Sequence, residues 1–197
     1  MYYFVGYLLK IVLSLFGRLK VYDKEKLPQS EGYVIACTHT GWLDIFWLGI
    51  SILPLKINFM AKMELFQNKI LKRLLESLNA FPINRENPGP SAIKIPRKLI
   101  KEGEIVGIFP SGTRTSEDVP LKRGAVTIAT AAKAMIVPAA YAGPNNFKDL
   151  LKFQNPKIIF GDPIYIPEDL SRKEAMDVMM KKLNEAMHNL QQVLALK

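Results

Sequence analysis

Cysteine, histidine and long apolar runs are all scarce in this chain. Its 197 residues include one cysteine, Cys37, and two histidines, His39 and His188. One cysteine excludes an internal disulfide, and no cluster of cysteine and histidine has the spacing of metal ligands. We therefore expect no metal cofactor. Because Cys37 lies in an apolar segment, we expect its thiol to be buried and unreactive.

The N-terminal apolar stretch is too short to cross a membrane. It runs from Tyr2 to Phe16, whereas a spanning helix needs roughly 20 residues. It also lacks the small-residue cleavage site of a signal peptide. Its aromatic rings suit the lipid headgroup region, and basic residues follow it at Arg18 and Lys20. We expect residues 1–20 to form an apolar, membrane-anchoring helix in the interface; a helix packed on the domain is the alternative.

Acidic residues are outnumbered, 18 against 27 basic residues, which gives a net charge of +9. Such an excess suits nucleic acid, an acidic membrane surface or a phosphorylated substrate. The chain has no helix-turn-helix, zinc-finger or RNA-binding signature, and its basic residues are spread out rather than packed in one tract. Nucleic acid is therefore the least favoured partner, and membrane lipids are favoured.

Short β-like runs alternate with helical patterns, which predicts an α/β fold: a single domain, residues 21–197, with a mostly parallel or mixed sheet flanked by helices. The predicted strands are Tyr33–Thr38, Ile57–Ala61, Ala80–Asn84, Ile105–Phe109, Met135–Tyr141 and Lys157–Phe160. The predicted helices are Trp42–Leu53, Glu64–Leu78, Ser91–Lys101, Gly124–Lys133 and Ser171–Leu194. Pro96 should kink or break the third helix, and Ser171 with Glu174 should form a capping box on the last.

The stretch Thr38–Asp44 follows the first predicted strand of this domain and carries the best candidates for catalysis. Four residues separate His39 from Asp44. A carboxylate beside a histidine fixes the imidazole tautomer and stabilises the imidazolium, which makes the ring a better general base. A tight turn from a strand into a helix would bring the two side chains together, so His39 is the candidate base.

Three further segments place basic or small residues at strand ends. Phe109–Arg114 combines small residues, whose backbone N–H groups can approach an anion, with an arginine. Phe81–Arg85 also ends in an arginine, and Met60–Leu65 contains Lys62 between a strand and a helix. Each segment alone also fits an ordinary role, respectively a turn, a solvated arginine and a charged helix start.

In this order the segments resemble the motifs of the glycerolipid acyltransferase family, and most closely those of its 1-acylglycerol-3-phosphate acyltransferases. His39 and Asp44 match the family's H-x4-D motif, and Lys62 matches a phosphate-associated lysine. The remaining matches are Ile83, Asn84 and Arg85; Phe109, Pro110, Gly112, Thr113 and Arg114 in an F-P-E-G-T-R motif; Leu121–Ala125; and Ile136–Ala139. The resemblance extends from about Leu27 to about Ile166.

The chain departs from the family pattern at four positions. Ser111 stands where the family usually has glutamate, and Asn84 where it usually has aspartate. Asn79 replaces a glycine, and Thr38 replaces the asparagine before the histidine. The histidine, its carboxylate partner and the basic residues remain, so the departures bear on the acceptor rather than on the chemistry.

The resemblance implies transfer of a fatty acyl group from a thioester, either acyl-CoA or acyl-acyl-carrier protein, to 1-acyl-sn-glycerol 3-phosphate (lysophosphatidate), forming phosphatidate. His39 would be the general base and Asp44 its partner. The phosphorylated acceptor would be bound by Lys62, Arg85, Ser111, Gly112, Thr113 and Arg114. No cofactor beyond the donor is implied. The implied partners are membrane lipids and lysophosphatidate, with acyl carrier protein as a further partner if it carries the donor, and the implied location is the cytoplasmic face of the membrane.

Three other interpretations stay open. The acceptor could be another lysolipid, because Ser111 borders its expected site. A non-catalytic module that binds anionic lipid would need the basic residues and the N-terminal helix, but it has no need of a base such as His39. A nucleophilic Ser111 would require a G-x-S-x-G elbow, which Phe109 and Pro110 do not supply.

Overall fold

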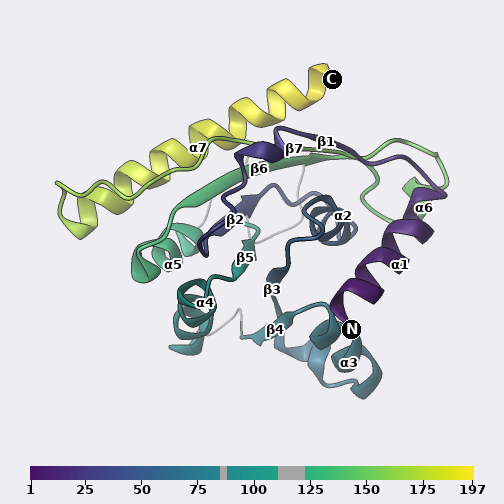
Figure 1. The fold of residues 1–197 in the computed structure, drawn as a ribbon, viewed down its shortest axis with the longest axis horizontal. Helices are drawn as coiled ribbons and strands as arrows, with labels where there is room; N and C mark the ends of the chain where they lie inside the picture. The colour runs from purple at the N-terminus through teal and green to yellow at the C-terminus, as the bar shows by residue number, and fades with distance from the viewer. Residues whose placement is uncertain (85–87, 111–122) are drawn as a thin grey trace.

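Strands and helices alternate along the chain as the apolar pattern predicted. The computed structural model describes residues 1–84, 88–110 and 123–197. The strands are β1 (Lys20–Tyr22), β2 (Val34–Cys37), β3 (Ile57–Lys62), β4 (Ala80–Ile83), β5 (Ile105–Ile108), β6 (Ile136–Ala142) and β7 (Lys157–Phe160). The helices are α1 (Tyr2–Ser14), α2 (Asp44–Ser51), α3 (Lys69–Ser77), α4 (Ser91–Lys101), α5 (Gly124–Ala132), α6 (Phe147–Leu150) and α7 (Arg172–Leu196), with short 3-10 turns η1 (Lys24–Lys26) and η2 (Met63–Phe66) (Figure 1).

The described residues form one seven-stranded sheet in the order β1-β7-β6-β2-β5-β3-β4. All neighbouring strands pair in parallel except β6 and β7, which are antiparallel. The predicted α/β domain with a mixed sheet is therefore confirmed. Because β2 to β6 run in the same direction, their carboxyl ends meet at one edge, which is where ligands bind in open α/β sheets.

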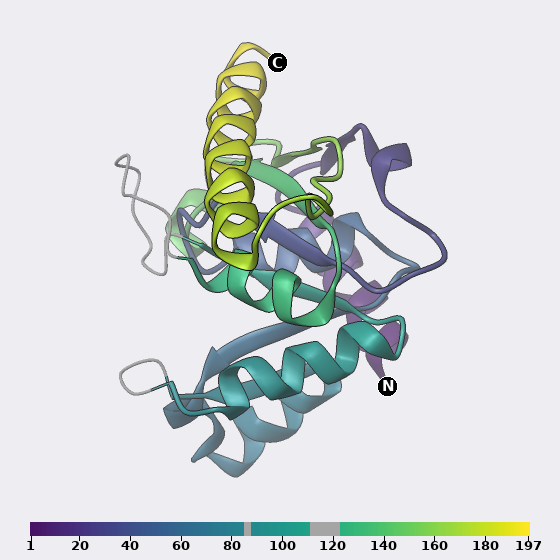
Figure 2. The ribbon, with the colours of Figure 1, turned by 90° about the vertical axis from the view of Figure 1, so that its left-hand side faces the viewer.

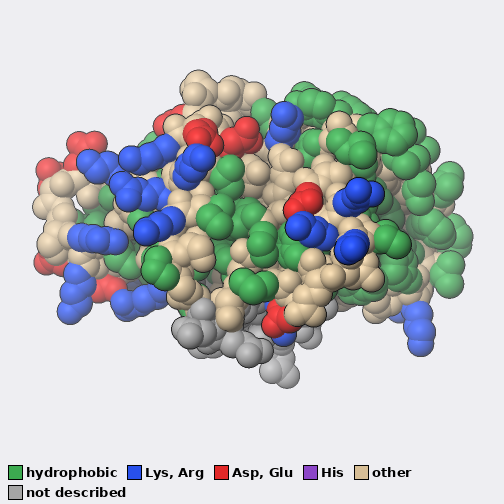
Figure 3. All heavy atoms as spheres, turned by 90° about the horizontal axis from the view of Figure 1, so that it is seen from below, with side chains coloured by type: hydrophobic (Ala, Val, Ile, Leu, Met, Phe, Trp, Pro, Cys, Tyr) green, Lys and Arg blue, Asp and Glu red, His purple; other side chains and the backbone are tan. Residues whose placement is uncertain are grey.

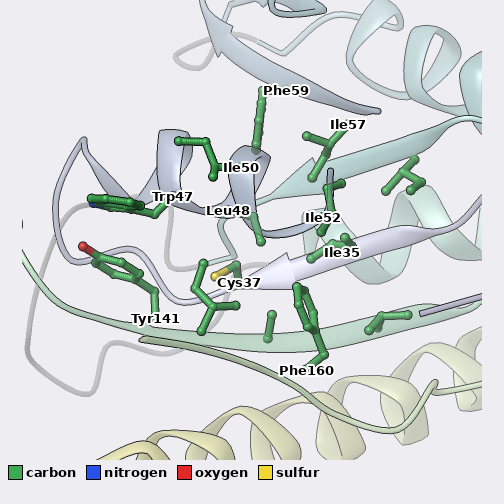
Figure 4. Packing of buried hydrophobic residues seen from close by; sticks show 14 of the residues in the cluster. Ile35, Cys37, Trp47, Leu48, Ile50, Ile52, Ile57, Phe59, Tyr141 and Phe160 are labelled. Atoms are coloured by element: carbon green, nitrogen blue, oxygen red, sulfur yellow. The ribbon is translucent and has the colours of Figure 1, made fainter. Parts of the chain in front are cut away.

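Side chains of the central strand alternate between two cores, as a strand buried on both faces requires. Val34 and Ala36 of β2 face a cluster shared with α4, α5 and α7. Ile35 and Cys37 face the opposite cluster, to which α1 and α2 contribute (Figure 4). The helices thus cover the sheet on both faces, with α7 lying across one of them (Figure 2). This double cover leaves the strand ends as the place where a site can open.

Three local features differ from or refine the sequence prediction. The capping box at the start of α7 is confirmed, since Ser171 and Glu174 each accept a hydrogen bond from the other's backbone N–H. The break predicted at Pro96 is absent, because α4 continues through this buried proline. A proline in the second turn removes only one intrahelical hydrogen bond, and apolar packing of the ring compensates for it. The short elements β1 and α6 were not predicted.

Helix α1 packs on the domain along one side and leaves apolar side chains exposed along the other. Its inner side packs on the domain: Gly6 and Leu13 are buried, and the Tyr2 hydroxyl accepts a hydrogen bond from the Ile57 N–H at 3.1 Å. Its outer side leaves Phe4 71% and Ile11 63% exposed. In the described part of the chain, no helix has both the length and the apolar character to cross a bilayer. Membrane contact of α1 stays a prediction.

Gly32, just before β2, offers a test of how closely helix α4 approaches the start of this strand. A Cβ atom there would overlap the carbonyl oxygen of Ile100 in α4, whereas a Cβ at Gly124 would meet nothing within 4 Å. We expect Gly32→Ala to lower the free energy of unfolding by about 1–3 kcal/mol, the range for overpacked sites. Gly124→Ala should leave it nearly unchanged or raise it. Equilibrium urea unfolding compares the two; equal midpoints would contradict the close approach.

Candidate active site

The turn between β2 and α2 brings the two predicted catalytic side chains together. His39 follows the end of β2, and Asp44 is the first residue of α2, so the helix start folds back over the strand end. The Nδ1 atom of His39 lies 3.1 and 3.0 Å from the two carboxylate oxygens of Asp44. His39 is 5% exposed and Asp44 is fully buried. The expected pairing of these side chains is present in the structure.

Backbone groups of the same turn complete the environment of the Asp44 carboxylate. Its Oδ2 atom accepts hydrogen bonds from the N–H groups of Thr40 at 2.9 Å and Gly41 at 3.1 Å. The start of α2 adds the favourable end of a helix dipole. Because an ionised carboxylate can only accept, His39 must donate from Nδ1, which leaves the lone pair on Nε2. The turn therefore prepares the imidazole to take up a proton.

A second segment, just after β6, holds this turn in place by hydrogen bonds. The Thr40 hydroxyl donates to the side-chain oxygen of Asn145 at 2.7 Å, and the Trp42 N–H donates to the Asn145 carbonyl at 3.2 Å. A Cβ atom at Gly41 would overlap that same carbonyl oxygen, so the close approach requires glycine. Thr38, one of the departures from the family pattern, accepts a hydrogen bond from the Tyr141 N–H at 2.9 Å.

An aromatic stack holds the plane of the imidazole. The ring of Phe109, the residue after β5, lies 4.4 Å from the His39 ring at an interplanar angle of 30°. Phe59 of β3 stacks in turn on Phe109, with ring centroids 6.1 Å apart. Stacking of this kind restricts rotation of the ring, so Phe109 fixes the orientation of the imidazole.

His39 lines an apolar cavity of about 380 Å³. The walls come from strands β3, β4 and β5 and from helices α4 and α5, and include Met60, Ile83, Ile93, Ile108 and Ile128. A cavity with these side chains suits a hydrocarbon chain. Among the described residues that line it, His39 is the one with an ionisable side chain. The arrangement thus places a base at the edge of an apolar site.

Only part of the predicted binding set falls within the described residues. Lys62 ends β3, with its Nζ atom 3.5 Å from a carboxylate oxygen of Glu64 and its side chain 45% exposed. Lys62 pairs with Ile83 in the sheet, so β4 ends beside it. Arg85, Ser111, Gly112, Thr113 and Arg114 lie outside the described residues.

Two other residues singled out in the sequence have clear local roles. Asn79 has a φ of 56° at the end of α3, a left-handed conformation that asparagine and glycine tolerate best, which explains why it can replace the family's glycine. Cys37 is fully buried, as predicted. Burial and the nearby negative charge of Asp44 both raise the pKa of the Cys37 thiol well above its usual value.

The fold and the turn can now be compared with known proteins. The family model described as Acyltransferase matches residues 18–142, which include β2, the His39 turn, β5 and all of β6. The chain belongs to the acyltransferase family. Within the described residues no three His, Cys, Asp or Glu side chains lie close enough together to hold a metal ion.

Two relatives and one solved structure bear on this acyltransferase. It is 56% identical over 193 residues to the 1-acyl-sn-glycerol-3-phosphate acyltransferase of Bacillus subtilis, covering 97% of both chains. It is 38% identical over 168 residues to the enzyme of that name from Streptococcus pneumoniae, covering 84% of this chain and 63% of the other. The crystal structure of a 1-acyl-sn-glycerophosphate acyltransferase from Thermotoga maritima shares the fold, with a TM-score of 0.66 at 19% identity, covering 92% of this chain and 77% of the other.

The site contains contacts that sequence reasoning did not find. Asn145 lies more than 100 residues from the turn that it clamps, and no local pattern indicates that pairing. Phe109 was noted as part of a motif, but its stacking on His39 depends on the neighbouring positions of β5 and β2. The residues of the apolar cavity come from five elements and could not be assembled without the fold.

Cys37 gives a direct test of the buried face of the turn. Because its thiol pKa is raised, the thiol should stay protonated at a mildly alkaline pH at which exposed thiols are largely ionised. We expect iodoacetamide to label Cys37 at least about a hundredfold more slowly in the folded protein than in urea, since only the thiolate reacts. Mass spectrometry measures the labelling. Equal rates in the two states would contradict a buried thiol behind the catalytic turn.

Proposed function

We propose that this acyltransferase moves a fatty acyl group from a thioester donor to 1-acyl-sn-glycerol 3-phosphate and forms phosphatidate. The activity of the Bacillus subtilis relative, named for this acceptor and 56% identical over 97% of both chains, supports the acceptor. The observation that carries the chemistry is the buried His39–Asp44 pair at the edge of an apolar cavity.

The reaction needs a base that can also return its proton. His39 Nε2 takes the proton of the acceptor hydroxyl as that oxygen attacks the thioester carbonyl. The tetrahedral intermediate collapses, the carbon–sulfur bond breaks, and the imidazolium gives its proton to the leaving thiolate. Asp44 offsets the transient charge on the ring through the contact at Nδ1. No acyl-enzyme is required, because the acceptor hydroxyl is the nucleophile.

The remaining substrate groups are assigned by the family motifs. The motifs assign Lys62, Arg85 and Arg114 to binding the acceptor phosphate, with Ser111 and Thr113 as further acceptor-binding residues. They assign the backbone N–H groups around Gly112 to stabilising the tetrahedral oxyanion. The location of Lys62 at the carboxyl edge of the sheet supports its part in this role. An acyl chain occupies the cavity that His39 lines. The donor is acyl-CoA or acyl-acyl-carrier protein, with no further cofactor.

The enzyme works at the cytoplasmic face of a membrane, where α1 lies in the interface. The exposed side of α1 and the net charge of +9 support this location. Seen from below, hydrophobic side chains gather at the end of the molecule that α1 forms, with Lys and Arg side chains beside them (Figure 3). Such a surface suits an anionic bilayer.

His39→Ala should lower kcat for acyl transfer by about a hundred- to ten-thousand-fold, the usual contribution of a general base. Asp44→Asn should also lower kcat, because an amide does not offset the charge of the imidazolium. His188→Ala is the matched control: this other histidine is exposed on α7, where its Nε2 atom lies 2.8 Å from the side-chain nitrogen of Gln192, so its loss should leave the rate unchanged.

The assay uses acyl-CoA and acyl-acyl-carrier protein with a small panel of lysolipid acceptors, and product identity defines acceptor and donor. Circular dichroism and a thermal melt check that each variant is folded. A folded His39→Ala variant that keeps its activity would remove the base from this mechanism. Phosphatidate as a minor product would favour another lysolipid acceptor.

Membrane contact of α1 is tested without deleting the helix, because Leu13 and Tyr2 tie it to the core. The double variant Phe4→Ser/Ile11→Ser changes only exposed side chains. We expect its affinity for anionic vesicles to fall by about tenfold or more, given the apolar area that would leave the membrane. The control is Val193→Ser/Leu196→Ser on α7, also exposed. Equal sedimentation with vesicles for both variants would rule out α1 as the contact.

A further inference from the structure

Exposed aromatic side chains gather beside the catalytic turn, on the side away from the apolar cavity. Trp42, within the turn, is 41% exposed, and Phe147 of α6 is 58% exposed. Their rings meet edge to face, with centroids 4.9 Å apart. Leu151 and Phe153 follow α6 and are 66% and 65% exposed. We call these four residues the α6 patch; an exposed apolar cluster of this kind indicates an interaction surface.

The α6 patch continues into the exposed side of α1. The Phe153 ring stacks on Phe16, just after α1, with centroids 6.2 Å apart. The next residues stay together, since the Arg18 N–H donates to the Asn155 side chain at 2.8 Å. Leu15, at the end of α1, is 71% exposed. Figure 1 shows α6 lying beside this end of α1, so the two exposed apolar surfaces form one continuous face.

Phe153 is held in a strained backbone conformation while its side chain stays largely exposed. Its φ of 52° lies in the left-handed region that glycine adopts readily and a bulky residue does not. Glycine is also the usual residue after a helix end in this conformation. Burial in the protein does not account for a phenylalanine here, because the ring is 65% exposed. A contact outside the protein would account for it.

The charges around the α6 patch suit an anionic surface. Lys148 and Lys152 alternate with its apolar residues, and Arg18 and Lys20 follow α1. The single acidic side chain within α6, Asp149, is neutralised by Lys152, whose Nζ atom lies 2.6 Å from it. Rings and aliphatic side chains interspersed with lysines are the composition of surfaces that lie in the interface of an anionic membrane.

We propose that the α6 patch is a second membrane contact, which holds the catalytic turn on the surface of an anionic bilayer. This rests on the proposed membrane acyltransferase and adds how its site is oriented. Asn145, two residues before Phe147, accepts hydrogen bonds from Thr40 and Trp42, so the segment that leads into α6 is attached to the turn. A bilayer in contact with Trp42 therefore lies three residues along the chain from His39, and a lysolipid reaches the site without crossing water.

Tryptophan fluorescence tests this contact in the full-length protein. The chain has two tryptophans; Trp47 is 1% exposed and Trp42 is 41% exposed, so a change on binding reports Trp42. With vesicles of phosphatidylglycerol and phosphatidylcholine we expect a blue shift and quenching by lipids brominated on the acyl chain. The Trp42→Phe variant, in which only Trp47 remains, should show neither. Vesicle-bound protein with unshifted, unquenched emission would overturn the proposal.

The strained residue provides a second test in which folding and membrane binding respond differently. Phe153→Gly relieves the left-handed strain, so the urea midpoint should stay unchanged or rise. The affinity of this variant for the same vesicles should fall by about fivefold, because it lacks a ring that the membrane would half bury. The control Tyr165→Ser removes a ring that is 64% exposed, next to the amino end of β6, and should bind like the original protein.

The proposal would be overturned if Phe153→Gly bound the vesicles with unchanged affinity. It would also be overturned if Tyr165→Ser lost as much vesicle affinity as Phe153→Gly. Failure of the proposed function has a different signature. In that case the original protein transfers no acyl group to detergent-dispersed lysophosphatidate, whereas the fluorescence and sedimentation results remain as expected.

Discussion

The buried carboxylate of Asp44 is the interaction on which the site depends. A charge removed from water is strongly unfavourable unless hydrogen bonds replace its hydration. Here the imidazole of His39 and two backbone N–H groups of the same turn supply them. The requirement works in both directions, because the carboxylate can be buried only if the turn closes, and a closed turn fixes the histidine. Folding and catalytic geometry are therefore set by the same contacts.

Contacts with neighbouring strands and loops hold this turn closed. Gly41 lets the Asn145 carbonyl approach the backbone, and Thr38 ties the strand end to β6. Phe109 adds a rigid surface for the imidazole. None of these contacts is strong alone, but each removes one way for the turn to open. A preorganised base is effective because it does not have to be ordered during the reaction.

Most of the sheet could be predicted from the sequence because its strands are short, continuous apolar runs between polar breaks. The six longer strands match the prediction, whereas β1 has three residues and α6 has four, too few for any periodicity. Pro96 shows the limit of a local rule: it was expected to kink or break α4, and the helix continues through this buried proline without a break.

In the candidate site, too, the local contacts could be predicted from the sequence and the long-range ones could not. The pair His39 and Asp44 could be predicted, because a local turn connects them. Asn145 and the stacking of Phe109 could not, since they depend on which strands become neighbours in the sheet. The departures were informative in part: Asn79 fits the left-handed backbone that its position requires, so the replacement of glycine there is conservative in conformation.

In the proposed reaction, the two sides of the sheet would contact different parts of the lipid. The apolar cavity lies on the side of α4 and α5, and the exposed rings of α1 and α6 lie on the side of α2. The His39 turn stands between them at the carboxyl edge, with its base lining the cavity and its tryptophan partly exposed. An amphipathic acceptor has the same division, a hydrocarbon chain and a charged head joined at the glycerol. In the proposed reaction, a base at the border between two apolar regions would act on the one part of such a molecule that stays at the interface, which is its hydroxyl.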